Sequence, residues 1–201
     1  MRAELRAAAR TVAAFAVGIA LGLAVRPSPS LILPYAYVFL YVVVATAGVY
    51  VGLSWRRLVR AGKRIVTLGM AFMASAMTGD VIIGALVSYA LGLPLTLTLA
   101  ASLGSGWYSF TGPFLSLISP SMGVIGFVAN QLREDLTLAL FPLLYRTVGE
   151  GSVVMGGATT MDTTLGVITR YGGPEVGLEG MVQGVALTLL IPVLLPAVVR
   201  L

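Results

Sequence analysis

Long apolar runs, separated by short polar or basic stretches, organise the chain. A helix needs about 20 apolar residues to cross a membrane, and about five runs approach or exceed that length. They cover Ala8–Val25, Leu31–Trp55, Ile65–Leu91, Met122–Tyr145 and Glu175–Val199. The pattern predicts an all-α polytopic membrane protein with about five full transmembrane helices.

Two further apolar segments are interrupted by glycine and hydroxyl residues. The first joins Leu95–Leu103 to Phe114–Ser119 through Gly104–Pro113, whose glycines, proline and hydroxyls disfavour a regular lipid-facing helix. The second is Ser152–Thr169, with the polar stretch Gly156–Thr164 inside it. A membrane tolerates unwound backbone only inside protein or along a water-filled cavity. We therefore expect two broken or re-entrant segments, and such pairs mark the binding site of many transporters.

These elements form a single transmembrane domain, 1–201, in three parts. Residues 1–64 hold two N-terminal spans and a basic loop, 65–121 hold the third span and the first broken segment, and 122–201 hold the rest. Five of the 13 Lys and Arg residues lie between Arg56 and Arg64. The positive-inside rule places this loop in the cytoplasm, and the N-terminus, two spans earlier, on the same side. A cleaved signal peptide is the alternative for the first run, but no small-residue cleavage site follows it.

The topology of the second half has two solutions. If the broken segments are hairpins, the first opens outward and the second inward. If both cross the membrane fully, the orientation of the later spans changes. The sequence does not decide between these solutions.

The composition supports a membrane protein and argues against an enzyme. Hydrophobic residues make up 58% of the chain and charged residues 10%, whereas soluble domains carry about 25% charged residues. The absence of His and Cys removes imidazole acid–base chemistry, thiol nucleophiles and the usual soft metal ligands. No phosphate-binding loop is present. We expect no cofactor and no nucleic-acid partner, because the net charge of +5 is explained by the basic loop.

A charged triplet, Arg133-Glu134-Asp135, lies about halfway along the run Met122–Tyr145. An ionised group at that depth costs roughly 2.5–3.5 kcal/mol on insertion scales. Glu134 and Asp135 are about 100° apart around a helix, so they cannot face the same way. The functional interpretation is that one carboxylate binds a cation or a proton during transport while Arg133 neutralises the other. The alternative is an internal ion pair that only fixes helix packing.

Polar groups also lie in the third span and in the first broken segment. Asp80, near the centre of Ile65–Leu91, is either a cation or proton site or a packing contact. Trp107, Tyr108 and Ser109 lie in the glycine-rich stretch. An aromatic ring there can pack on an ammonium group; the alternative is an aromatic belt at the membrane interface.

The second broken segment carries a carboxylate among hydroxyl groups. Asp162 lies next to Thr163 and close to Thr159 and Thr160. Hydroxyls, freed carbonyls and a carboxylate are oxygen ligands suited to Na⁺ or to an ammonium group. Alternatively, Asp162 caps a half-helix. The two interpretations overlap, because a half-helix end in mid-membrane is itself an ion site.

Four sequence blocks occur together in one order. They are Gly106-Trp107-Tyr108-Ser109 followed by Gly112; Leu132-Arg133-Glu134 with Pro142 eight residues after the Glu; Gly157-Ala158-Thr159-Thr160-Met161-Asp162-x-Thr164-Leu165; and Arg170-x-Gly172-Gly173. Over about residues 45–195, this combination resembles the lysine exporter family of bacteria and archaea (LysO-type).

The resemblance implies export of L-lysine or a related cationic amino acid across the inner or plasma membrane. Because an inside-negative potential opposes the outward movement of a cation, we expect exchange for an entering H⁺ or Na⁺. It implies dependence on intramembrane acidic residues, of which Glu134 matches a family position; Asp162 and Arg170 match by motif. Asp135 stands where the family is expected to be apolar, and Asp80 has no known counterpart. The family is distantly similar to cation/proton antiporter-like folds with inverted repeats and crossed broken helices.

The resemblance also bears on partners. Full-length family members carry a further N-terminal hydrophobic module with another intramembrane acidic residue. We therefore expect either a separately encoded small membrane protein that supplies this module, or a homodimer. The alternative function is a non-transporting membrane subunit that completes a larger transport complex with such a partner.

Overall fold

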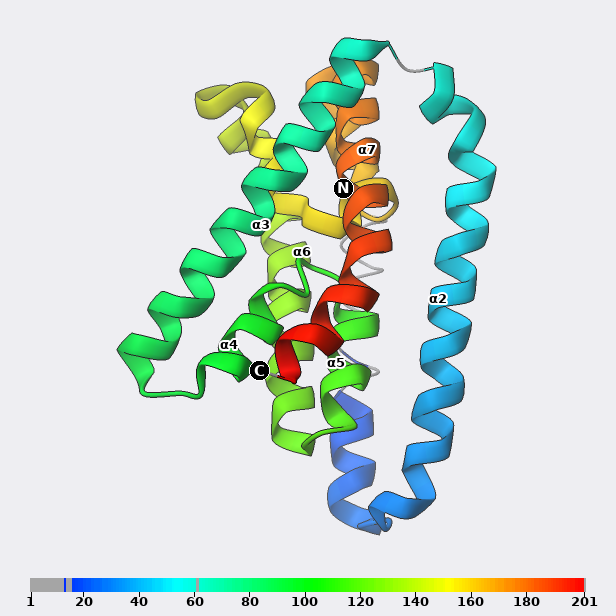
Figure 1. Ribbon diagram of the computed structural model, residues 1–201, viewed down its shortest axis with the longest axis vertical. Helices are drawn as coiled ribbons and strands as arrows, with labels where there is room; N and C mark the ends of the chain where they lie inside the picture. Colours follow the sequence, from blue (N-terminus) through cyan, green and yellow to red (C-terminus); the bar gives the residue numbers. More distant parts are fainter. Residues whose placement is uncertain (1–12, 14–15, 61, 201) are drawn as a thin grey trace.

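The computed structural model describes residues 13, 16–60 and 62–200, and these residues are helical or in turns, with no strand. A helical segment at 16–25 precedes the longer elements. Those elements are α2 (Pro29–Arg60), α3 (Lys63–Leu91), α4 (Leu95–Ser102), α5 (Tyr108–Ser116), α6 (Pro120–Val148), the 3-10 helix η1 (Gly149–Met161) and α7 (Leu165–Val199). Figure 1 shows α3, α6 and α7 running roughly along the long axis, with α2 standing apart beside them.

Two of the described helices, α3 and α7, are long and apolar enough to cross a membrane. With 29 residues α6 is as long as α3, but it contains the charged triplet. With 32 residues α2 is also of spanning length. The expected run Ala8–Val25 lies partly outside the described residues, so the number of about five full spans stays a prediction.

The first broken segment is a hairpin made of α4 and α5, called here the first hairpin (95–116). Its tip, 103–107, turns back on itself through Ser105 and Gly106, which have φ values of 48° and 89°. Both arms lead toward the lower half of Figure 1, where α3 ends and α6 begins. There Gly123 of α6 packs against Ser116 so closely that a Cβ would lie 2.6 Å from the Ser116 side chain.

The second broken segment is a hairpin that starts from the opposite end of the molecule, called here the second hairpin (149–173). It consists of η1, a turn at 162–164 and the first part of α7, which breaks at Gly173 with φ 88°. Arg64, at the start of α3, forms ion pairs with Glu150 and Glu175, 3.4 and 3.7 Å away. These contacts bring both arms of the second hairpin to the end where α3 starts.

The tips of the two hairpins meet through main-chain atoms. The Ala158 amide donates a hydrogen bond to the Ser105 carbonyl oxygen, 2.8 Å away. Gly157 has φ 57°, and a Cβ on it would overlap the Ser105 carbonyl. Only glycine fits here, because the position requires both a left-handed backbone and the absence of a side chain.

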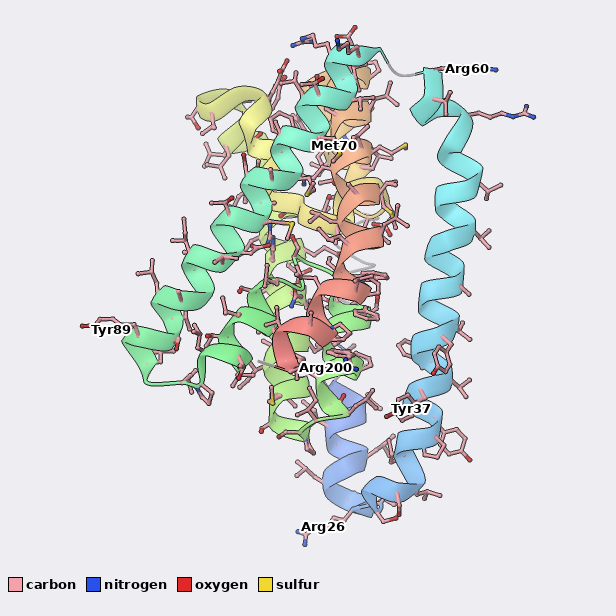
Figure 2. All side chains as sticks on the ribbon, viewed as in Figure 1. Arg26, Tyr37, Arg60, Met70, Tyr89 and Arg200 are labelled. Atoms are coloured by element: carbon pink, nitrogen blue, oxygen red, sulfur yellow. The ribbon has the colours of Figure 1, made fainter. Side chains whose placement is uncertain are left out.

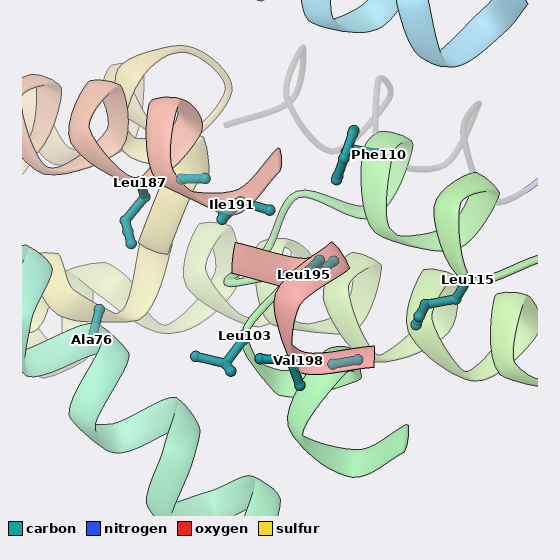
Figure 3. Close-up of a cluster of buried hydrophobic side chains, with 10 residues drawn as sticks. Ala76, Leu103, Phe110, Leu115, Leu187, Ile191, Leu195 and Val198 are labelled. Atoms are coloured by element: carbon teal, nitrogen blue, oxygen red, sulfur yellow. The ribbon is translucent and has the colours of Figure 1, made fainter. Parts of the chain in front are cut away.

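An apolar cluster fastens the lower half of α7 to the first hairpin. It contains Leu103 and Phe110 of that hairpin together with Leu187, Ile191 and Leu195 of α7, all buried (Figure 3). Since lipid is as apolar as these side chains, the cluster stabilises the fold through close packing rather than exclusion of water. The outer faces are also apolar, and Tyr89 of α3 points away from the bundle (Figure 2).

Candidate functional site

A small polar pocket lies where the hairpin tips meet α6 and α7. It is lined by Gly106, Trp107, Tyr108, Ser109, Glu134, Ala158, Thr159, Met161, Asp162, Thr163 and Thr188. Its volume is about 60 Å³. Since a cavity needs only roughly 10–15 Å³ of this kind of space to hold one water, the pocket has room for an ion or an ammonium group.

Two carboxylates reach the pocket from different elements and are linked by one residue. Glu134 comes from α6 and is only 4% exposed. The Thr163 hydroxyl donates to Glu134 Oε2 at 2.8 Å, and the Thr163 amide donates to Asp162 Oδ1 at 2.6 Å. The site therefore combines two carboxylates and a hydroxyl, which is a donor set for a cation.

The N-terminus of one helix faces the same pocket. The helix α5 starts at Tyr108, and Tyr108 and Ser109 both line the pocket. The first amides of a helix have no intrahelical acceptor, and this end attracts anions. The pocket thus lies between groups suited to a cation and groups suited to an anion.

Hydrogen bonds hold the first hairpin tip in place. Asn130 of α6 accepts from the Gly106 amide at 2.6 Å and donates to the carbonyls of Ala101 and Gly126, both at 2.8 Å. The Thr159 hydroxyl donates to the Gly156 carbonyl and lies 3.2 Å from the Thr164 hydroxyl. The walls of the pocket are therefore fixed by buried side chains rather than by flexible loops.

Arg133 does not neutralise a neighbouring carboxylate of the triplet; it forms a salt bridge with Asp80 of α3. Its Nε donates to the Met155 carbonyl at 2.8 Å and its Nη2 to the Val154 carbonyl at 3.2 Å. One guanidinium thus ties α6 to α3 and to the second hairpin. The pair borders a different, mostly apolar groove of about 480 Å³ between α3, α4 and α6.

Three other predicted site residues lie outside the lining of the polar pocket. Asp135 accepts a hydrogen bond from Gln131 Nε2 at 3.1 Å. The Thr160 hydroxyl donates to the Gly157 and Gly180 carbonyls, so it joins the second hairpin to α7. Arg170 is exposed, and its guanidinium carbon lies 5.8 Å from the Tyr171 ring centre.

The buried polar residues that sequence reasoning missed include Asn130, Glu179, Gln183 and Thr188. Thr188 lines the pocket, and Gln183 Nε2 donates to the carbonyls of Val153 and Gly157. Each lies inside an apolar run, which is the signal that could have identified it. A lone amide or hydroxyl is a weak signal beside a charged triplet.

Comparison with known protein families shows which proteins this chain is related to. The model of the lysine exporter LysO family matches residues 12–199. The chain belongs to the lysine exporter LysO family. Among its LysO-family relatives, the Lysine exporter LysO of Escherichia coli (strain K12) is 34% identical over 63% of this chain. A Putative lysine exporter of Haemophilus influenzae (strain ATCC 51907 / DSM 11121 / KW20 / Rd) is 35% identical over 66% of it.

The matched regions differ in extent. They span 43% of the Escherichia coli LysO protein and 67% of the Haemophilus influenzae protein. No solved structure matches. Because the LysO family is a family of transporters, the apolar helices and the unwound hairpins belong to a membrane protein that is not an enzyme.

Proposed function

We propose that this chain exports L-lysine or a related cationic amino acid from the cytoplasm, in exchange for H⁺ or Na⁺. The observation that carries the proposal is the pocket at the hairpin tips, which is lined by two carboxylates and by the N-terminus of α5. An amino acid with a cationic side chain carries both kinds of charge. Its ammonium groups pair with Glu134 and Asp162, and its carboxylate meets the amides at the start of α5.

The size of the pocket adds a requirement to this mechanism. About 60 Å³ accommodates a coupling ion or a single ammonium group, so binding of a complete substrate requires the hairpins to separate. The mostly polar contacts between the tips, such as the hydrogen bond from Ala158 to Ser105, can be exchanged for contacts with substrate or water. We expect the compact pocket to represent a state closed around a coupling ion.

Exchange is favoured by the energy of moving a cation outward. An inside-negative membrane potential opposes that movement by about 2.3 kcal/mol per charge per 100 mV. Entry of H⁺ or Na⁺ releases energy of the same kind. A carboxylate that binds substrate and coupling ion alternately links the two movements, and Glu134 is suited to this role because Thr163 already donates to it.

The proposed orientation is multi-pass in the cell membrane, with the basic loop and the N-terminus in the cytoplasm. The second hairpin then opens inward and the first outward. The arrangement supports the inverted-repeat comparison, because each hairpin follows a long helix and enters from the end where that helix stops. The N-terminal residues lie outside the described part of the chain, so the argument rests on the loop that contains Arg60 and Lys63.

A partner is part of the proposal. The described side chains of α3 expose a continuous apolar surface, including Ile82, Ile83, Leu86 and Tyr89. A second copy of the chain, or a separately encoded N-terminal module, would cover part of that surface in place of lipid. The alternative of a non-transporting subunit predicts a partner that co-purifies and no effect of lysine on melting.

The test is lysine counterflow into proteoliposomes that contain the purified chain, with Glu134→Gln beside the wild type. We expect the wild type to exchange labelled lysine and Glu134→Gln to lose at least nine-tenths of the rate, since the amide cannot pair with an ammonium group. The matched control is Asp135→Asn, the adjacent carboxylate outside the pocket. Equal rates in the wild type and Glu134→Gln would contradict the proposal.

A further inference from the structure

A second group of acceptor atoms is buried in α7, away from the polar pocket. Glu179 and Gln183 are both 0% exposed. Neither carboxylate oxygen of Glu179 receives a hydrogen bond, and neither does the Gln183 side-chain oxygen. Since the two residues are four apart on one helix, their side chains are neighbours. Three acceptor oxygens on these neighbouring side chains therefore lack a hydrogen-bond donor.

Close packing of α3 keeps this place enclosed. A Cβ on Gly69 of α3 would lie 2.7 Å from the Glu179 carbonyl oxygen and 2.5 Å from the Val182 side chain. On the other side, Gly180 faces Val153 and Thr160 of the second hairpin. The absence of side chains at these two glycines lets three elements close around Glu179.

The neighbouring charges do not satisfy the carboxylate. Arg64 Nη1 lies 3.8 Å from Glu179 Oε1, but the Arg64 side chain is 62% exposed and also pairs with Glu150 and Glu175. An exposed, shared guanidinium contributes little. Glu150 and Glu175 repel a charge on Glu179. These three are the charged groups that face it from α3, η1 and α7.

A buried carboxylate without a donor is costly unless a cation accompanies it. The Gln183 amide cannot supply a donor to Glu179, because Nε2 already donates to the carbonyls of Val153 and Gly157 at 3.2 and 3.0 Å. The surroundings of Glu179 are thus rich in oxygen acceptors and poor in donors.

We infer that Glu179 and Gln183 form a second site, for a small monovalent cation. This site lies on the Arg64 side of the contact between the two hairpin tips. The ion is a proton or Na⁺, because both supply positive charge to oxygen atoms in a small space. The site is separate from the pocket of Glu134 and Asp162, which lies at the hairpin tips.

Gln183 connects this site to the contact between the two hairpin tips. Its amide holds the Gly157 carbonyl, and the next residue, Ala158, donates to the Ser105 carbonyl of the first hairpin. A cation that binds the Gln183 side-chain oxygen shifts the amide group, and this changes the hydrogen bond from Nε2 to the Gly157 carbonyl. The site therefore couples ion occupancy to hairpin contact, and this coupling role rests on the export function proposed above.

Infrared difference spectroscopy of the reconstituted chain tests the site without requiring transport. A step in pH should give a carbonyl-stretch signal of a buried carboxyl group that is absent in Glu179→Gln and retained in Glu175→Gln and Glu134→Gln. If Na⁺ at constant pH removes this signal, the two ions compete for the site; if Na⁺ has no effect, the ion is a proton. A Glu179→Asp variant should keep the signal at a shifted frequency. Identical wild-type and Glu179→Gln spectra in both steps would overturn the inference.

A transport measurement tests the coupling role. Counterflow needs no net ion movement, so Glu179→Gln should keep it within about twofold while losing at least tenfold of lysine uptake driven by a pH or Na⁺ gradient. Glu175→Gln, whose side chain is 75% exposed and pairs with the same Arg64, should behave as wild type. Unchanged gradient-driven uptake in Glu179→Gln would refute the coupling role. Absence of counterflow in the wild type would refute the export function without affecting the infrared result.

Discussion

The amide of Ala158 and the carbonyl of Ser105 join the two hairpins directly, across 2.8 Å. The contact uses main-chain atoms only, so it depends on backbone shape rather than on side-chain chemistry. Gly157 makes that shape possible, because it combines a left-handed backbone with the space that the Ser105 carbonyl occupies. A glycine elsewhere on the same hairpin offers a way to separate these two effects.

We predict that Gly157→Ala prevents the hairpins from meeting. The left-handed backbone alone costs a residue with a side chain roughly 1–2 kcal/mol, and the overlap with Ser105 adds to this. Gly149→Ala is the matched control, because Gly149 has a similar φ of 67° with nothing within 4 Å of an added Cβ. Thermal melting in detergent should show a much larger loss for Gly157→Ala, and equal losses would contradict the steric explanation.

The salt bridge between Asp80 and Arg133 should behave as a structural pair. Removing one partner of a buried pair typically costs about 3–5 kcal/mol because the other charge is left alone. Asp80→Asn and Arg133→Gln should each lower the melting temperature strongly, and the double variant should lose less than the sum of the two. Additive losses would argue against the pair and in favour of an independent cation site at Asp80.

Two threonines of the second hairpin should separate binding from stability. Thr163→Val removes the hydroxyl that donates to Glu134, so the apparent KM for lysine or for the coupling ion should change while melting changes little. Thr160→Val removes a hydroxyl bound to two carbonyls, which should cost about 1–3 kcal/mol of stability with KM unchanged. Measuring both quantities in both variants checks the assignment, and a reversed pattern would contradict it.

Asn130 should control the position of the first hairpin tip. Asn130→Asp keeps an acceptor for the Gly106 amide but loses the two donations to Ala101 and Gly126. We expect lower stability and faster hydrogen exchange at the tip, with exchange in the second hairpin less affected. Exchange that rises equally over the whole chain would indicate global unfolding instead.

Single cysteines provide a test of orientation, because the natural chain contains none. A Gly62→Cys variant, with its cysteine within the basic loop, should react with a membrane-impermeant maleimide only from the cytoplasmic side. Cysteine at Ser121, near the open end of the first hairpin, should react only from outside. Labelling of both positions from one side would exclude the proposed topology.

The sequence predicted much of the architecture because apolar length and glycine content act locally. The expected spans Ile65–Leu91 and Met122–Tyr145 correspond to α3 (Lys63–Leu91) and α6 (Pro120–Val148). The unwound centre of the first hairpin, 103–107, overlaps only the start of the expected stretch Gly104–Pro113, because the residues from Tyr108 onward are helical in α5. Whether these segments are hairpins was left open, since this depends on contacts such as Arg64 with Glu150, 86 residues apart.

The candidate site was predictable only in part, for a similar reason. Glu134 and Asp162 stand out as carboxylates in apolar or hydroxyl-rich surroundings, and both line the pocket. The partner of Arg133 was not predictable, because Asp80 lies 53 residues earlier in the chain. Glu179 was hidden within the run Glu175–Val199, where it is one carboxylate close to the exposed Glu175. Whether these residues bind substrate or ions stays a prediction.

The bond between Arg133 and Asp80 also constrains how the chain is made. During synthesis α3 leaves the ribosome first and carries Asp80 into the bilayer before its partner exists. Later, α6 carries three adjacent charged residues, which are energetically costly in lipid without partners. We therefore expect α6 to insert more readily when α3 is already in the bilayer to pair with Arg133. The second hairpin, whose Met155 and Val154 carbonyls bind Arg133, follows α6 in the chain and is synthesised after both partners. The order of α3 and α6 in the chain therefore means that Asp80 remains unpaired until Arg133 has been synthesised.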